Sequence, residues 1–196
     1  MTGRQSRLSR LAQRYASDRR GSAAAEFALW AVALVVPIAS AMDVGFYAYE
    51  NMELNNAAQA AAQAAWSLCK TSTMLPAATA CSGLQSALTT AAHSTSLGSS
   101  AVLQSSSEGY YCMNTAGALQ LVGTAGVIPV SGAGTAPTGP VSSCASLGTG
   151  FAGNTLPSGD YVQIKVNYAY SPVFRGLTVL GLLPTTVTRT AWMRLQ

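Results

Sequence analysis

The hydrophobic pattern begins with one long apolar run near the N-terminus. Residues 22–42 are apolar except for Glu26 and small hydroxyl side chains. This length is about the 20 residues that an α-helix needs to cross the hydrocarbon core of a membrane. Pro37 lies inside the run, and because proline removes one helix hydrogen bond, we expect a kink there.

The helical pattern continues past the apolar run. Residues 57–65 read AAQAAAQAA, and no glycine or proline follows Gly45 until Pro76. Alanine is the best helix former, so we expect one continuous helix from near Ser22 to near Leu68, about 70 Å long. Alanine on most faces of its outer half would let neighbouring helices, or the chain's own C-terminal domain, approach closely.

The pattern near the C-terminus predicts two antiparallel strands. Residues 161–170 read YVQIKVNYAY, in which apolar side chains recur at every second position from Val162 to Tyr170. A second candidate strand spans residues 185–194, although Arg189 interrupts its apolar face. We expect this pair to pack on the long helix.

The remaining segments have weaker patterns. Residues 71–160 are rich in Ser, Thr, Gly, Ala and Pro; within them, residues 82–93 could form a short helix and residues 131–159 are best read as a loop. The apolar connector at 173–183 is too short and too interrupted by glycine to be a second membrane span. The predicted fold class is α+β: a long N-terminal membrane-spanning helix that continues into a small antiparallel-β head stabilised by disulfides.

The charges are concentrated in an N-terminal leader. The formal net charge is +4, but residues 1–21 hold six arginines and one aspartate, whereas residues 22–196 hold five Lys or Arg and six Asp or Glu. A basic leader beside an apolar span favours a cytoplasmic N-terminus. No aromatic platform or folded basic face accompanies these arginines, so we expect no nucleic-acid partner. The predicted segments are a cytoplasmic leader at 1–21, a membrane-spanning and extended helix at 22–70, and an exported α+β head at 71–196.

Four cysteines, Cys69, Cys81, Cys112 and Cys144, follow the apolar span. If the leader is cytoplasmic, they lie on the exported side, where disulfides persist. Four cysteines allow three connectivities; proximity in the sequence favours Cys69–Cys81 with Cys112–Cys144, although spacing alone does not decide between them. No C-x-x-C pair is present and His93 is distant in sequence from every cysteine, so we expect no metal site.

The segment between the leader and the apolar run reads Gly21-Ser-Ala-Ala-Ala-Glu26. This is the layout of a type IV prepilin-like signal. Glycine has no Cβ to obstruct a peptidase, so we expect cleavage between Gly21 and Ser22 by a prepilin peptidase. Glu26 could then neutralise the new terminal amine of the next subunit and set the axial register of a helix bundle. The plainer interpretation is a solitary interfacial glutamate that reaches back to the lipid headgroups.

An ordinary secretory signal is the main alternative. Residues 39–41 read Ala-Ser-Ala, an A-x-A pattern, and cleavage after Ala41 would release a secreted soluble domain that begins at Met42 and has a binding or adhesive role. The long leader and the position of Glu26 argue against it.

Two further functional classes, an enzyme and an adhesin, can be judged from single residue types. An enzyme is not expected, because His93 is the only histidine and no nucleophile motif, carboxylate pair or phosphate loop is present. We therefore expect no cofactor and no small-molecule substrate. An adhesin could use its tyrosines to contact a surface or a glycan, although such strands more often pack a small core. The tyrosines available for such contacts are Tyr110, Tyr111, Tyr161, Tyr168 and Tyr170.

The block GSAAAEFAL at 21–29, the DVGF at 43–46 and the Ala-rich block from Asn55 together resemble the TadE-like minor pseudopilins of tight-adherence (Flp-type IV) pilus systems. The resemblance covers about residues 20–65. Phe27 stands where the major pilins of these systems tend to have tyrosine, which favours a minor subunit. TadF-type and TadG-type proteins share this N-terminal pattern, so the paralogue stays open.

That resemblance implies a single-pass protein of the bacterial inner membrane with a periplasmic head, which could also enter an extracellular pilus. It implies processing between Gly21 and Ser22, with Glu26 as the acid of the motif. It further implies a role in assembling or tipping an adhesive pilus for surface attachment. The partners that it implies are the prepilin peptidase, other minor pseudopilins, the pilus assembly platform and membrane lipid.

Overall fold

The computed structural model describes residues 20–174 and 185–196. Most of the predicted leader, and most of the apolar connector at 173–183, lie outside these residues. The chain forms two compact units, one made of Met1–Gly45 with Pro172–Leu182 and the other of Phe46–Ser171 with Leu183–Gln196. The segment boundaries expected at 21/22 and 70/71 stay predictions.

Helix α2 spans Arg20–Leu68 and confirms the long helix expected from the sequence. Its 49 residues contain no break in the helical assignment at Pro37, and the kink expected there stays a prediction. In the first unit, the large apolar side chains of α2 are exposed around the helix. In the second unit, the same helix carries alanines that are completely buried.

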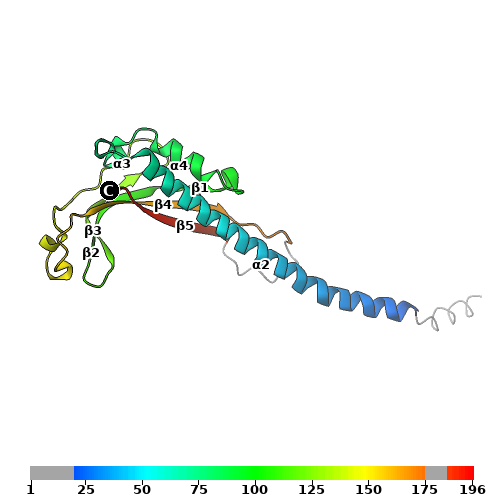
Figure 1. The fold of residues 1–196 in the computed structure, drawn as a ribbon. Coiled ribbons are helices and arrows are strands. Elements are labelled where there is room, and N and C mark those ends of the chain that lie inside the picture. The colour runs from blue at the N-terminus through cyan, green and yellow to red at the C-terminus, as the bar shows by residue number, and fades with distance from the viewer. Residues whose placement is uncertain (1–19, 175–184) are drawn as a thin grey trace, which may run out of the picture. The chain divides into compact units, whose positions relative to one another are not determined.

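The second unit contains one antiparallel sheet (Figure 1). Strand β4 (Gly159–Ala169) pairs with β5 (Thr186–Arg194) along one edge, and with β2 (Ser106–Met113) and the short β1 (Val102–Leu103) along the other. Strand β3 (Leu119–Ile128) pairs with β2 as a hairpin. The β4–β5 pair confirms the two strands expected from the alternating pattern. The β2–β3 hairpin was not predicted.

Short helices connect these elements. α4 (Leu84–Ala92) confirms the short helix expected at 82–93, and it follows the four-residue α3 (Ala77–Ala80). The segment 131–159 is a loop, as expected, with two isolated bridges to β3. The 3₁₀ turns are η1 (Ser72–Met74), η2 (Gly98–Ser100), η3 (Cys144–Leu147) and η4 (Thr149–Phe151).

The main core lies between the helices and one face of the sheet. Val162, Ile164 and Val166 are fully buried, and they belong to the same cluster of buried residues as α4 and the alanines of α2. Alanine permits this close approach because its side chain is a single methyl group. The α2 residues in the core are Leu54, Ala57, Ala58, Ala61, Ala62 and Ala65, which recur at helical spacing along one face.

Two glycines of β3 let the following loop pack against its backbone. A Cβ at Gly126 would collide with the carbonyl oxygen of Thr135, and a Cβ at Gly123 would collide with that of Thr138. Gly123 also has a φ of +74°, which L side chains rarely adopt. These glycines therefore permit the two isolated β-bridges that hold the loop against β3.

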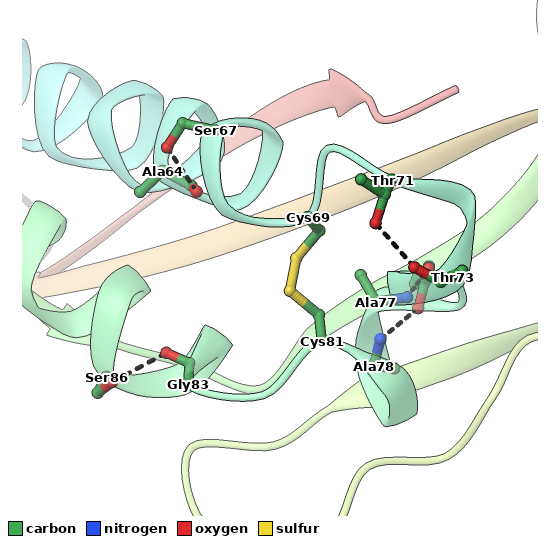
Figure 2. The surroundings of a disulfide bond; sticks show 11 residues. Ala64, Ser67, Cys69, Thr71, Thr73, Ala77, Ala78, Cys81, Gly83 and Ser86 are labelled. Atoms are coloured by element: carbon green, nitrogen blue, oxygen red, sulfur yellow. Dashed lines mark hydrogen bonds between the residues drawn. A yellow bond between two sulfur atoms is a disulfide. The ribbon is translucent and has the colours of Figure 1, made fainter.

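Two disulfides close the second unit, Cys69–Cys81 and Cys112–Cys144, with Cα–Cα distances of 5.8 and 5.7 Å. This is the connectivity that proximity favoured. Figure 2 shows the first bond, which joins the residue after α2 to the residue after α3. The second joins β2 to the start of η3 within a small separate cluster of buried side chains.

We expect loss of the Cys112–Cys144 bond to destabilise the head more than loss of the Cys69–Cys81 bond. The paired cysteines are 32 residues apart in the first case and 12 in the second. Loop-closure entropy then gives about 4 and about 3 kcal/mol respectively. Denaturant unfolding of the two double Cys→Ala variants measures the difference. The reverse order, or four free thiols in exported protein on non-reducing mass analysis, would contradict the assignment.

Candidate functional site

The expected cleavage site lies at the start of α2. The described part of α2 starts at Arg20, so the backbone of Gly21 and Ser22 is helical. A peptidase needs an extended peptide at the scissile bond, so cleavage between Gly21 and Ser22 requires this part of the helix to open locally.

Glu26 lies four residues after Ser22, and its side chain is exposed. Residues four apart share one face of a helix. The carboxylate of Glu26 is therefore near the position where cleavage would create a terminal amine. The sequence-predicted residues Gly21, Ser22 and Glu26 are thus brought together within two helical turns, while Pro37 and the four cysteines lie elsewhere.

A band of exposed apolar side chains follows Glu26 along α2. Phe27 and Leu29 are each 74% exposed, and Trp30 is 70% exposed. The most apolar 18-residue window of this helix has a mean hydropathy of 2.0. Such a surface is unstable in water and requires lipid or other helices to cover it. Further exposed members of the band are Val32, Leu34, Val35, Ile38, Met42 and Val44.

Comparison with protein families matches residues 21–63 to the family described as TadE-like protein. This segment is TadE-like. The match begins at the predicted scissile glycine and includes Glu26, the exposed apolar band and the first buried alanines of α2. It covers less than a quarter of the chain. Comparisons with curated proteins and with solved structures found no match.

The TadE-like region indicates involvement in the Tad pilus and, with it, other components of that pilus as partners. Among the residues that the structure describes, one helix is long and apolar enough to cross a membrane, which fits a single-pass membrane protein. Both findings concern the same stretch of chain, because the match at residues 21–63 includes the exposed apolar band.

Asp43 has a structural role that the sequence did not reveal. It follows the apolar run and is fully buried. Its Oδ1 accepts hydrogen bonds from the backbone N–H groups of Val173 and Phe174, at 2.9 and 3.4 Å. A single carboxylate therefore ties the segment that follows β4 to the helix within the first unit.

A second unpredicted feature is a pair of buried carboxyl groups in the head. Glu108 on β2 is 1% exposed, and its two oxygens accept hydrogen bonds from the N–H groups of Ala77 and Ala78, at 2.5 and 2.6 Å. Glu108 therefore caps α3, the short helix that the Cys69–Cys81 bond also restrains; Figure 2 shows this region.

Asp160 on β4 is the second member of the pair and is 4% exposed. Burial and the neighbouring Glu108 carboxyl group raise the pKa of Asp160 from 3.8 to about 7. Glu108 and Asp160 are the only acidic residues in positions 71–196. The scarcity of acidic residues in the head was the one sequence feature that could have pointed to this pair. Glu108 and Asp160 are far apart along the chain and form no motif.

Proposed function

We propose that this chain is a minor pseudopilin, processed by a prepilin peptidase between Gly21 and Ser22, that acts in assembling or tipping a tight-adherence type IV pilus for surface attachment. The observation that carries the proposal is the TadE-like match, which begins at Gly21 and continues through the exposed apolar band of α2. The chain would act through assembly rather than through catalysis of its own.

The proposed topology follows from the charges that flank the apolar band. The arginines of residues 1–21 would remain in the cytoplasm, and the helix would cross the inner membrane. The head would then reach the periplasm, and the extracellular pilus if the subunit enters the filament. The two disulfides of the head support this topology, because disulfides persist in the oxidising environment that an exported domain would meet.

Glu26 would link processing to assembly. An acidic side chain within a membrane helix costs on the order of 2.5–3.5 kcal/mol on insertion scales. Cleavage would create a cation on Ser22, four residues away, and in a helix bundle the amine of one subunit could meet the carboxylate of its neighbour. The free-energy cost of placing the Glu26 carboxylate in the membrane would then be offset only at the axial register that brings the two charges together. This dependence on register favours ordered docking with other minor pseudopilins on the assembly platform.

We expect the Glu26→Ala variant to be processed normally but to fail in pilus assembly. Removal of the carboxylate leaves the scissile bond in place and abolishes the charge pairing between subunits. Immunoblotting measures the mature form, and electron microscopy counts the pili. Glu26→Gln, which keeps the shape of the side chain, should fail as well.

Glu53→Gln is the matched control for this test, because Glu53 is an acid on the same helix beyond the apolar run, where it is half-buried and accepts hydrogen bonds from Ser96. It should leave piliation unchanged. Normal piliation with Glu26→Ala would exclude the proposed register role, and loss of piliation with Glu53→Gln would show that the effect is not specific to Glu26.

A further inference from the structure

The sheet has one face that α2, α3 and α4 do not cover. The helices α2, α3 and α4 pack on the side that carries Val162, Ile164 and Val166. The alternate residues of β4 point to the other side and remain partly exposed. The registers of the strands bring this second set together with residues of β2 and β5.

Three aromatic side chains from three adjacent strands cluster on this second face. Tyr111 on β2 makes edge-to-face contacts with Tyr161 on β4, at 5.7 Å between ring centroids, and with Trp192 on β5, at 5.3 Å. Trp192 is 47% exposed, so part of this cluster is open to solvent. We call the surface formed by Tyr111, Tyr161, Trp192, Lys165 and Arg194 the aromatic face.

Glycines make room for the two tyrosine rings. A Cβ at Gly109 would lie 3.1 Å from the ring of Tyr111, and a Cβ at Gly159 would lie 2.7 Å from the ring of Tyr161. Each ring therefore rests over the backbone of a glycine two residues earlier on its own strand. Larger side chains at these glycines would displace the rings. The glycines of β2 and β4 therefore help to fix the positions of the two tyrosine rings.

A pocket of about 400 Å³ adjoins the rings of Tyr111 and Tyr161. This volume lies within the range of small-ligand pockets. Asn154 lies in the wall and is held by a 2.9 Å hydrogen bond from its Nδ2 to the carbonyl oxygen of Met113. Arg194 also lines the pocket. The aromatic face therefore ends in a concave site with polar groups at its edge.

The charged side chains of this face are cationic. The guanidinium carbon of Arg194 lies 6.0 Å from the ring centroid of Tyr161, and its Nε donates a 2.8 Å hydrogen bond to the backbone oxygen of Gln196. Lys165 lies on the same side of β4 as Tyr161. The two acids of these strands, Glu108 and Asp160, are buried on the opposite side.

We propose that the aromatic face binds an acidic polysaccharide. The apolar C–H faces of sugar rings stack on aromatic side chains, and a guanidinium group binds a uronate carboxylate through two parallel hydrogen bonds. Amides and hydroxyls lie beside the rings and the cations on this face and suit sugar hydroxyls: Gln163 is opposite Trp192, Thr190 is opposite Lys165, and Asn167 follows Lys165 on β4. Burial raises the pKa of the Tyr111 phenol, so it stays a protonated donor at neutral pH.

A polysaccharide suits this surface better than a protein partner does. Tyrosine, tryptophan and arginine are common in protein interfaces as well, but lysine is depleted there, and the aromatic face carries Lys165 together with the polar Gln163 and Thr190. The inference concerns the head alone and does not depend on the role of α2 in a pilus, so each can fail without the other.

The test uses the full chain in detergent micelles and polygalacturonate as the probe, with binding measured by calorimetry. We expect saturable binding that Trp192→Ala and Arg194→Gln each weaken at least tenfold. Lys165→Gln, a second cation variant, should weaken it by a smaller factor. Trp66→Ala and Arg189→Gln are matched controls: Trp66 is 51% exposed on α2, and Arg189 lies on β5 facing the helix, where it contacts Asn51. Both should bind within twofold of the wild type.

Two further probes test the chemistry of the ligand. Neutral dextran and polyglutamate should each bind at least tenfold more weakly than polygalacturonate, because one lacks the carboxylates and the other lacks sugar rings. No saturable binding of polygalacturonate, equal binding of polyglutamate, or equal weakening in the control variants would overturn the proposal. It would also be overturned if light scattering showed a dimer that Trp192→Ala abolishes, because a second copy would then occupy the face.

Discussion

Gly21→Arg is expected to abolish maturation, so that only the uncut chain accumulates in the membrane. The glycine precedes the proposed scissile bond, and its lack of a Cβ leaves space for the catalytic groups of the peptidase. An arginine there would fill that space with a long cationic side chain. The effect should be nearly complete, because a substrate bond that cannot reach the reacting groups loses most of its rate. Immunoblotting of membranes measures the ratio of uncut to mature chain.

Gly45→Arg is the matched control. Gly45 lies on the same helix, and a Cβ there would have open space around it. The same side chain placed at this position should leave processing unchanged. A mature-sized product from Gly21→Arg would remove the cleavage assignment, whereas failure of both variants would indicate a general defect in membrane insertion.

Asp160→Asn is expected to stabilise the head at pH 8 and to flatten its dependence on pH. The pKa of Asp160 is about 7 in the folded chain, and an unfolded aspartate has a pKa of about 3.9. The folded state therefore holds the proton more tightly, and the contribution of Asp160 to stability is complete below about pH 4. It is lost as the pH rises through 7. One pKa unit corresponds to about 1.4 kcal/mol, so the loss is of the order of 2–4 kcal/mol.

Denaturant unfolding of the full chain at pH 5 and pH 8, followed by tryptophan fluorescence, measures this contribution. The wild type should be less stable at pH 8 than at pH 5, and Asp160→Asn should reduce that difference. Hydrogen bonds from Ser96 lower the pKa of Glu53, so this acid is ionised at both pH values and Glu53→Gln should keep the difference. Equal stability of the wild type at both pH values, or an Asp160→Asn variant less stable than the wild type at pH 8, would contradict the assignment.

The parts of the fold that the sequence predicted are those in which one physical signal dominates. The apolar run and the alanines of residues 57–65 have no helix-breaking glycine between them except Gly45, and α2 forms as expected. Apolar and polar side chains alternate along residues 162–170 because one face of β4 is buried and the other is partly exposed. The disulfides join the first cysteine to the second and the third to the fourth, which is the connectivity that the sequence favours.

The β2–β3 hairpin was missed because tertiary packing determines its composition. The glycines of β3 are required by the loop that lies against its backbone, and in the sequence they resemble turn residues. In β2, the buried position 108 is occupied by a glutamate that caps α3, which hides the apolar alternation. Each residue satisfies a partner far away in the sequence, so local pattern alone does not identify the strand.

The candidate sites also differ in whether the sequence alone reveals them. Gly21, Ser22 and Glu26 could be found from the sequence because their chemistry is local to one stretch of helix. Asp43 binds backbone groups 130 residues away. The aromatic face depends on the registers of three strands, one of which was not predicted. Long-range strand pairing brings its members together, and no spacing along the chain encodes that arrangement.

The central claim, that this chain is processed as a pseudopilin, is tested most directly by its N-terminus. Mass spectrometry of the protein recovered from native membranes identifies the first residue. We predict Ser22. A chain that begins at Met42 would be a secreted domain released by ordinary signal cleavage, and an uncut chain that begins at Met1 or Thr2 would be a plain membrane anchor; either result would contradict the proposed processing.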